Sequence, residues 1–385
     1  MKKPKNVVIL GATGSIGRNA VREVLEHPKE FSVSCVAANS SVSELVQTAV
    51  KLDCHKVITG SPEYYPQLKE LLPPGFTASC GIEAMCEAVS APEVDVVLCA
   101  IIGTAGIKPV ISALRAGKKV ALASKEVLCL AGELVMAEAA RSPGGCLVPV
   151  DSEHSGLFQC LAGHPGKQVK KLILTASGGP FRTWEKEQIR TAAVEQALRH
   201  PTWSMGKKIT IDSASMMNKA LEVVEASFLF QVPGEKISVL VHPQSVVHAL
   251  VQWCDNSVIS QWSVPDMRAA IRYGLSYPDR LAGSVPELDC RMMSSLEFFP
   301  VDEEKFPAIK LAQYALASGG TMPCVMNAAN EVAVEAFCSG RIPFGKIWEV
   351  VRTAMESHQT VHNASLEEIL KIDQHSRSAA YTLTV

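Results

Sequence analysis

A glycine-rich segment directly after a short apolar run constrains the fold of this chain most. The run VVIL at residues 7–10 leads into GATGSIG at 11–17, which has the spacing G-x-x-G-x-x-G. Glycines at this spacing permit a tight turn and let the backbone approach a pyrophosphate, and the next helix then points its N-terminus at that anion. We therefore predict a helix over 15–27 and a second strand over 33–38, as in a dinucleotide-binding β-α-β unit.

The same alternation of strand and helix patterns continues to about residue 150. Further apolar strands are predicted at 56–59, 95–101, 120–123 and 147–150, with helices at 43–52 and 108–116 between them. Such alternation is typical of a doubly wound parallel sheet. The fold class is therefore α/β with a Rossmann-like N-terminal domain, and ligands should bind at the carboxyl ends of its strands.

The end of the second strand indicates which dinucleotide binds. Sites for NAD usually carry an Asp or Glu there, which binds the ribose 2′-hydroxyl. This chain instead has Asn39 and Ser40, with Arg18 on the neighbouring helix. Without an acid to repel a 2′-phosphate, the sequence favours NADP over NAD. The alternative is that Asn39 and Ser40 only form a turn.

Two strand ends carry residues suited to chemistry. Lys125 follows one strand, and Asp151 and Glu153 follow another. In an extended segment, residues two apart point to the same side. Two converging carboxylates are costly unless a cation lies between them. We therefore expect a cation site here, the alternative being a pair of solvated surface acids.

The second half contains a loop suited to phosphate and a loop suited to a lid. The segment SGGPF at 177–181 can bring several backbone N–H groups to a phosphate. The segment HPTWSMG at 200–206 places Trp203 and Met205 between a proline and a glycine, as in a mobile cover over a ligand. The alternative for the second segment is a loop packed permanently against the protein.

A helix predicted to begin at Asp212 or Ser213 carries a further polar set. Asn218 and Glu222 are four residues apart and share a helix face, with Lys219 beside them. Ser213, Asn218 and Lys219 are phosphate-binding types, and Glu222 offers a third carboxylate. An all-oxygen set favours a hard metal, Mg²⁺ or Mn²⁺. The alternative is an ordinary solvated helix face.

Composition excludes several classes of protein. Charged residues make up 20% of the chain and the net charge is −2, so no basic surface for nucleic acid is expected. The most apolar run, 94–106, is too short to span a membrane. The twelve cysteines include no C-x-x-C pair. We expect no leader segment, reduced thiols and a cytoplasmic location.

These motifs, in this order, resemble the 1-deoxy-D-xylulose 5-phosphate reductoisomerase family along nearly the whole chain. The resemblance rests on GATGSIG (11–17), ASKE (123–126), VDSEH (150–154), SGGPF (177–181), HPTWSMG (200–206), MNKALE (217–222), HPQS (242–245) and NAANE (327–331). It implies a dinucleotide domain over 1–150, a catalytic, metal-binding and dimerisation domain over 151–275 and a helical domain over 306–385. The prolines and acidic runs over 276–305 themselves predict a linker there.

The resemblance also implies a role for individual residues. The metal carboxylates would be Asp151, Glu153 and Glu222, with Lys125 counted among the catalytic residues. The substrate site would comprise Ser152, Glu153, Ser177, His200, Trp203, Ser213, Asn218, Lys219 and Glu222. The cofactor site would comprise Thr13, Gly14, Ser15, Ile16, Asn39, Ser40, Ser124, Glu126 and Gly206. One departure is that Asn39 stands where the family's cofactor loop often has a lysine.

The implied activity is the NADPH- and divalent-metal-dependent rearrangement and reduction of 1-deoxy-D-xylulose 5-phosphate to 2-C-methyl-D-erythritol 4-phosphate, in a homodimer. The general base stays open among Lys125, a carboxylate and metal-bound water. Two rival interpretations are another NADP-linked dehydrogenase and a non-catalytic NADP-sensing protein. Neither needs three carboxylates together with a Ser/Asn/Lys cluster, so the sequence favours the reductoisomerase.

Overall fold

The computed structural model describes residues 3–164, 166–203 and 205–385. The chain forms two compact units. The first comprises Met1–Val127, Val135–Ser155 and Asp266–Pro286, and the second comprises Leu128–Leu134, Gly156–Pro265 and Glu287–Val385. The boundaries of these units differ from those of the four segments expected from the sequence. That division into four segments stays a prediction.

The first unit is built on a parallel sheet of seven strands in the order β4-β3-β2-β1-β5-β6-β7. The strands are β1 (Lys5–Leu10), β2 (Phe31–Ala38), β3 (Lys56–Thr59), β4 (Thr77–Cys80), β5 (Val96–Cys99), β6 (Lys119–Leu122) and β7 (Cys146–Pro149). The six strands expected from apolar runs are confirmed. The sequence did not predict β4, because TASC is short and too polar to stand out as a buried strand.

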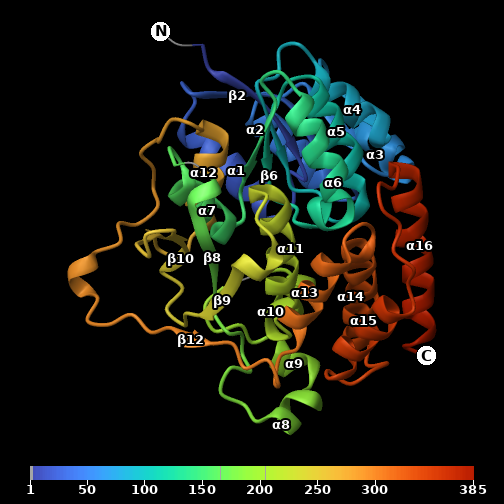
Figure 1. Ribbon diagram of the computed structural model, residues 1–385. Helices are drawn as coiled ribbons and strands as arrows, with labels where there is room; N and C mark the ends of the chain where they lie inside the picture. The colour runs from blue at the N-terminus through green and yellow to red at the C-terminus, as the bar shows by residue number, and fades with distance from the viewer. Residues whose placement is uncertain (1–2, 165, 204) are drawn as a thin grey trace. The chain divides into compact units, whose positions relative to one another are not determined.

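Helices cover both faces of this sheet, which confirms the doubly wound architecture. Figure 1 shows α1 and α12 on one side of the strands and α4 and α5 on the other. Val7, Val8, Ile9 and Leu10 of the central strand are all fully buried, as expected for a strand with helices on both faces. The helices of this unit are α1 (Ser15–Glu26), α2 (Val42–Lys51), α3 (Tyr65–Leu71), α4 (Gly81–Ser90), α5 (Ile107–Arg115) and α12 (Met267–Ser276), while α6 (Glu126–Arg141) and α7 (Ser152–Leu161) each contribute residues to both units.

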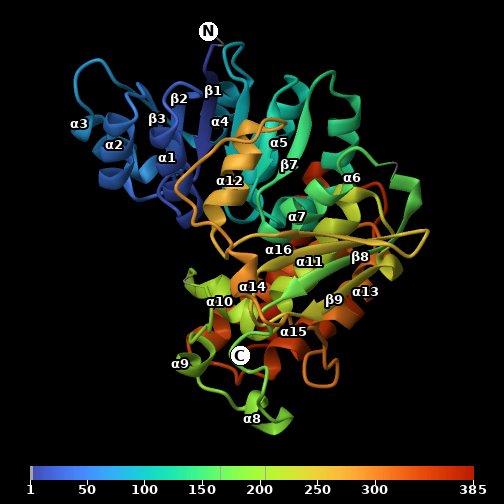
Figure 2. The same ribbon diagram turned by 90° about the vertical axis from the view of Figure 1, so that its left-hand side faces the viewer.

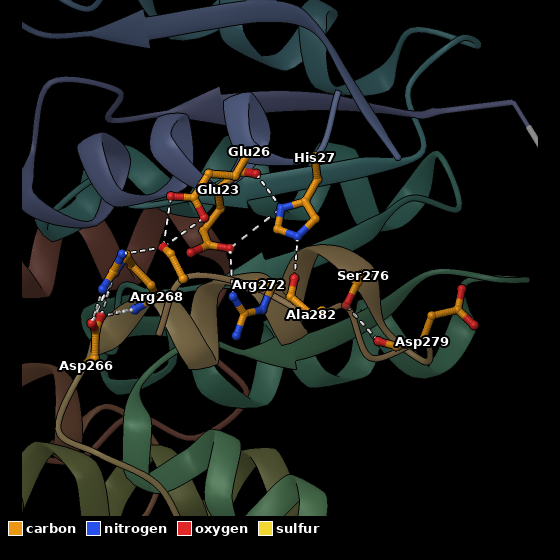
Figure 3. Close-up of polar contacts among 10 residues, drawn as sticks. Glu23, Glu26, His27, Asp266, Arg268, Arg272, Ser276, Asp279 and Ala282 are labelled. Atoms are coloured by element: carbon orange, nitrogen blue, oxygen red, sulfur yellow. Dashed lines mark hydrogen bonds and ion pairs between the residues drawn. The ribbon is translucent and has the colours of Figure 1, made fainter. Parts of the chain in front are cut away.

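The segment Asp266–Pro286 belongs to the first unit although it comes late in the chain. Figure 3 shows how polar contacts join it to α1: Arg272 Nη1 lies 3.4 Å from Glu23 Oε2, and His27 Nε2 lies 2.5 Å from Ala282 O. Glu23 is completely buried, and burial raises the pKa of its carboxyl against the opposing effect of Arg272. Part of the segment expected to be a linker, 276–305, is therefore packed against α1.

The second unit contains a mixed sheet in the order β11-β10-β8-β9-β12. Its strands are β8 (Val169–Ala176), β9 (Ile237–Val241), β10 (Val247–Trp253), β11 (Val258–Trp262) and β12 (Phe299–Pro300). β8 pairs in parallel with β9 and antiparallel with β10, and β11 forms one edge. Figure 2 shows β8 and β9 running alongside α11 and α13.

Helices form the rest of the second unit. They are α8 (Lys186–Arg190), α9 (Val194–Ala197), α10 (Lys207–Ala214), α11 (Met217–Phe230), α13 (Ala308–Ser318), α14 (Met322–Cys338), α15 (Lys346–Glu356) and α16 (Leu366–Thr382). The last four confirm the helical C-terminal region, in which α14 packs between α15 and α16 (Figure 1). No helix in the described ranges is long and apolar enough to cross a membrane.

The helix start predicted at Asp212 or Ser213 is wrong. Both residues lie inside α10, and the break follows them at Met216, whose φ of 61° is left-handed. Helix α11 then begins at Met217. Asp212 has the residue type of an N-cap, but its side chain is used in a tertiary contact instead, as described below.

Candidate active site

The glycine loop after β1 has the shape that a pyrophosphate requires. Gly11 has a φ of +89°, and a Cβ there would lie 2.5 Å from the carbonyl oxygen of Ala100. A Cβ on Gly17 would lie 2.1 Å from the carbonyl oxygen of Gly11. No larger residue fits at either position. Gly14 and Ser15 are exposed at the tip of the loop, Thr13 and Ile16 are half-buried beside it, and α1 begins there with no acidic residue in its first turn.

The end of β2 presents the two polar residues expected there. Asn39 and Ser40 are both exposed, and the backbone of Asn39 is fixed because its carbonyl accepts a 2.8 Å hydrogen bond from Thr59 Oγ1. Arg18 makes a double contact with Glu44 of α2, at 2.5 Å from Nε and 2.7 Å from Nη2. The charge of Arg18 is therefore paired with that of Glu44.

The ends of β6 and β7 bring together the lysine and an acid predicted from the sequence. Lys125 Nζ donates to Asp151 Oδ2 at 2.8 Å, and both side chains are largely buried. Ser124 Oγ donates to Glu126 Oε2 at 3.1 Å, so these two expected cofactor residues contact each other. Parallel strands that end at the same sheet edge account for this convergence.

The reason given for the convergence of Asp151 and Glu153 is wrong, although the convergence itself is present. An oxygen of Asp151 lies within 4.8 Å of an oxygen of Glu153. The segment is not extended: α7 begins at Ser152, and Ser155 N donates to Asp151 O at 2.8 Å. The two carboxylates meet because the chain turns directly into a helix. Ser152 Oγ also donates to Glu153 Oε2, at 2.5 Å.

Sequence reasoning did not assign a role to His154, which lies beside Asp151. Its side chain is fully buried and its Nδ1 lies 3.4 Å from Asp151 Oδ1. The spacing Asp-x-x-His could have predicted this contact, because residues three apart at the start of a helix share a face.

In the second unit, one histidine joins the predicted phosphate loop to α10. His200 Nε2 lies 3.0 Å from Ser177 Oγ and 3.1 Å from Ser213 Oγ. Gly179 fits tightly against the same helix, since a Cβ there would lie 2.9 Å from the carbonyl oxygen of Ser213. Two hydroxyls and an imidazole thus converge at the loop, as a phosphate-binding site needs.

The contacts of His200 define its tautomer. Its Nδ1 accepts hydrogen bonds from Thr202 N at 3.1 Å and from Trp203 N at 2.8 Å, so the ring proton lies on Nε2. Burial lowers the pKa of His200 and favours this neutral form. The start of the predicted lid is therefore held by the phosphate loop. Trp203 and Met205 are half-buried, Gly206 is the exposed N-cap of α10, and Ser204 lies outside the described residues.

Helix α11 presents the predicted polar face. Asn218 Nδ2 donates to Glu222 Oε1 at 2.5 Å, and Lys219 Nζ donates to Glu222 Oε2. Lys219 and Glu222 are 4% and 1% exposed, so the alternative of a solvated helix face is wrong. The two donors fix the orientation of the buried carboxylate of Glu222.

The joint between α10 and α11 is tied to the C-terminal helices by contacts that the sequence did not reveal. Asp212 Oδ1 accepts from Asn330 Nδ2 at 2.8 Å, and Trp348 Nε1 donates to the carbonyl oxygen of Ser215 at 2.9 Å. Asp212 and Asn330 are 118 positions apart. No local pattern relates residues at that separation.

The expected site residues therefore fall into two groups. Lys125, Asp151, Ser152 and Glu153 lie together in the first unit with the glycine loop, and the phosphate cluster and Glu222 lie in the second.

Comparison with known proteins covers most of the chain. Three family models match: 1-deoxy-D-xylulose 5-phosphate reductoisomerase over residues 7–132, its C-terminal domain over 147–230, and a further DXP reductoisomerase C-terminal domain over 262–379. The chain belongs to the 1-deoxy-D-xylulose 5-phosphate reductoisomerase family.

Individual members agree over their full length. The chain is 46% identical to the 1-deoxy-D-xylulose 5-phosphate reductoisomerase of Geotalea uraniireducens, with 97% of both chains covered. It is 46% identical to that of Bacteroides thetaiotaomicron, with 99% and 98% covered.

Two solved reductoisomerase structures share the fold. The enzyme from Zymomonas mobilis in complex with NADPH has a TM-score of 0.93 at 40% identity, with 99% of both chains covered. A DOX-P reductoisomerase in complex with NADPH, fosmidomycin and magnesium has a TM-score of 0.92 at 37% identity, with 99% and 98% covered.

Proposed function

We infer that this chain is an NADPH-dependent oxidoreductase of the non-mevalonate isoprenoid pathway. It rearranges and reduces 1-deoxy-D-xylulose 5-phosphate to 2-C-methyl-D-erythritol 4-phosphate. The observation that carries this inference is a family match over nearly the whole chain together with a full set of suitable side chains. Lys125, Asp151, Glu153 and Glu222 form the catalytic set, which a non-catalytic NADP sensor would not need.

The residues present fit both cofactors. The loop at Gly11 and Gly17 leaves no room for a Cβ and opens at the start of α1, as pyrophosphate binding requires. Thr13, Gly14, Ser15, Ile16, Asn39, Ser40, Ser124, Glu126 and Gly206 are proposed to hold NADPH. The oxygens of Asp151 and Glu153, within 4.8 Å of each other, suit Mg²⁺ or Mn²⁺, and we propose Glu222 as the third ligand.

The phosphate of the substrate is assigned to the second unit. Ser177, Ser213, Asn218 and Lys219 supply hydroxyl, amide and ammonium donors, and a charge-assisted bond from Lys219 is the strongest of these. His200 bridges Ser177 and Ser213 and carries the loop with Trp203. We propose that this loop covers the bound substrate and excludes water from it.

The reaction needs two changes in the substrate. A hydroxyl proton is lost, the carbon skeleton rearranges to an aldehyde, and the aldehyde is reduced by a hydride and a proton. When bound, NADPH supplies the hydride and the divalent ion polarises the substrate oxygens. Ser152 and Lys125 hold the substrate hydroxyl and carbonyl oxygens. The ammonium of Lys125 stabilises negative charge on oxygen, and its contact with Asp151 keeps it at the strand ends.

We also propose a cytoplasmic homodimer that does not bind nucleic acid. All twelve cysteines are free thiols, which supports a reducing compartment. Val258, Ile259 and Trp262 are exposed on edge strand β11, which supports pairing of the central region with a second copy. The proposed functional division remains 1–150, 151–275, 276–305 and 306–385.

One assay tests the function. Oxidation of NADPH is followed with 1-deoxy-D-xylulose 5-phosphate, with Mg²⁺ and with a chelator, and the product is identified. We expect Mg²⁺-dependent turnover and a preference for NADPH over NADH. The unphosphorylated sugar serves as a control and should react far more slowly. No turnover, or turnover that survives the chelator, would contradict the proposal.

A further inference from the structure

The motif NAANE at 327–331 has no role in the function proposed above, yet its last asparagine reaches the phosphate-binding region. Asn330 lies on α14 and is fully buried. Its Nδ2 donates at 2.8 Å to Asp212, which is 1% exposed and directly precedes Ser213 in α10. The other oxygen of Asp212 lies 2.8 Å from Lys208 Nζ.

A second contact fixes the same joint from another helix. The carbonyl oxygen of Ser215 accepts a hydrogen bond from Trp348 Nε1 of α15. The hydroxyl of Ser215 bonds back to the carbonyl of Ile211 at 3.0 Å. The helix breaks directly afterwards, at Met216. The relative directions of α10 and α11 therefore depend on a joint that the side chains of Asn330 and Trp348 contact.

This joint carries the groups assigned to phosphate. Ser213 precedes it, and Asn218 and Lys219 follow it within the first turn of α11. Gly179 of the phosphate loop also packs on the end of α10, against the carbonyl of Ser213. A small rotation of α10 would therefore move the hydroxyl of Ser213 relative to both the loop and Lys219.

The side chain of Asn330 satisfies Asp212 at an energetic cost. The Oδ1 atoms of both Asn330 and Asn327 are buried, and among the described residues neither has a hydrogen-bond partner, so what distinguishes Asn330 is its donor to Asp212. An unsatisfied buried polar atom destabilises a protein, and an apolar residue of similar size would avoid this cost. The amide donor is present because Asp212 needs a partner in a fixed place.

We propose that Asn330 and Asp212 are positioning residues for the substrate phosphate. Through their hydrogen bond the C-terminal helices set the position of Ser213 relative to Lys219, and Trp348 supports the same joint. The inference rests on the proposed function, because it assumes that Ser213 and Lys219 bind the phosphate of the sugar. A small displacement of a group that binds the substrate weakens its interaction with the substrate. The affinity for the substrate should therefore depend on the hydrogen bond between Asn330 and Asp212.

The test replaces Asn330 with an isosteric residue that cannot donate. Asn330→Asp places two acidic groups opposite each other, and we expect KM for 1-deoxy-D-xylulose 5-phosphate to rise about ten-fold or more. The kcat at saturation and the affinity for NADPH should change less than three-fold. Asn327→Asp is the matched control: it is equally buried on α14, but its Nδ2 donates to Glu331, at 3.1 Å. It should lower the thermal midpoint comparably without changing the substrate KM.

Reversal of the pair gives a rescue experiment. In Asp212→Asn/Asn330→Asp a donor and an acceptor face each other again, and the substrate KM should return to within three-fold of the original.

Trp348→Phe removes the hydrogen-bond donor to Ser215 and leaves Asp212 and Asn330 unchanged. It should also raise the substrate KM, which keeps the test valid if Asn330→Asp does not fold. Equal effects of the Asn330 and Asn327 variants, or no change in KM for Trp348→Phe, would overturn the inference. An inactive unmodified protein would instead reject the proposed function.

Discussion

Among single residues, Glu222 has contacts that point most directly to its proposed role as a metal ligand. It is 1% exposed and accepts hydrogen bonds from Asn218 and Lys219 of the same helix. A buried carboxylate that keeps its charge needs such donors or a cation. Its neighbours are the proposed phosphate ligands, so in this proposal one turn of α11 holds both a metal ligand and phosphate donors.

Glu222→Gln removes one negative charge with little change in shape. We expect turnover to fall roughly 100-fold and the Mg²⁺ concentration for half-maximal rate to rise, because the proposed ion loses an anionic ligand. Steady-state rates over a Mg²⁺ series measure both. Glu349→Gln on α15 is the control and should leave both values unchanged. Normal activity of Glu222→Gln at low Mg²⁺ would remove Glu222 from the metal site.

At the scale of elements, the loop that starts at His200 depends on one neutral imidazole. Its Nδ1 accepts two backbone N–H groups, and it can do so only while unprotonated. Burial holds the pKa of His200 below its ordinary value of about 6.5. The loop is therefore anchored at neutral pH and loses this anchor in acid.

The sign of the pH effect follows from that pKa. Between the lowered pKa and about 6.5, the unfolded chain binds a proton that the folded chain does not, so stability rises with pH in this window and falls as pH drops through it. His358, whose pKa is also lowered by burial, acts in the same direction. We expect His200→Gln to flatten part of the fall in thermal midpoint below about pH 6.5. His358→Gln should remove a separate part, and an unchanged profile in His200→Gln would contradict the anchor.

At the scale of the whole molecule, we propose that the edge of the second sheet forms the interface between two copies of the chain. Val258, Ile259 and Trp262 are 49%, 38% and 41% exposed on β11. Exposed apolar edge strands tend to pair with another chain unless they are protected. A second copy of this chain is the proposed partner.

Trp262→Arg places a charge in that surface. We expect light scattering after gel filtration to show a dimer for the unmodified protein and monomers for this variant at micromolar concentration. Tyr381→Arg, at a residue that is 54% exposed on α16, is the control and should stay dimeric. Monomers of the unmodified chain, or a Trp262→Arg dimer of equal stability, would reject β11 as the interface.

Local sequence patterns were sufficient for most elements and for the residue types of the site. The run at 7–10 and the glycines after it predicted β1 and α1, because each signal lies within a few residues. Asn218 and Glu222 were correctly placed on one face, since helix geometry relates positions four apart. The predicted helix start at Asp212 failed because the residue type of a cap does not reveal whether the side chain is used elsewhere.

By itself the sequence determined the doubly wound first sheet, the C-terminal helices, the family and the candidate ligands, since all of these follow from short-range periodicity or from recognisable motifs. Only the tertiary structure decided which partners those side chains meet. It placed Lys125 on Asp151, His200 between two serines, Asn330 on Asp212, and the segment after Asp266 against α1. The physical reason is that these contacts join residues far apart in the chain. Packing of whole elements brings such residues together, and no local pattern records it.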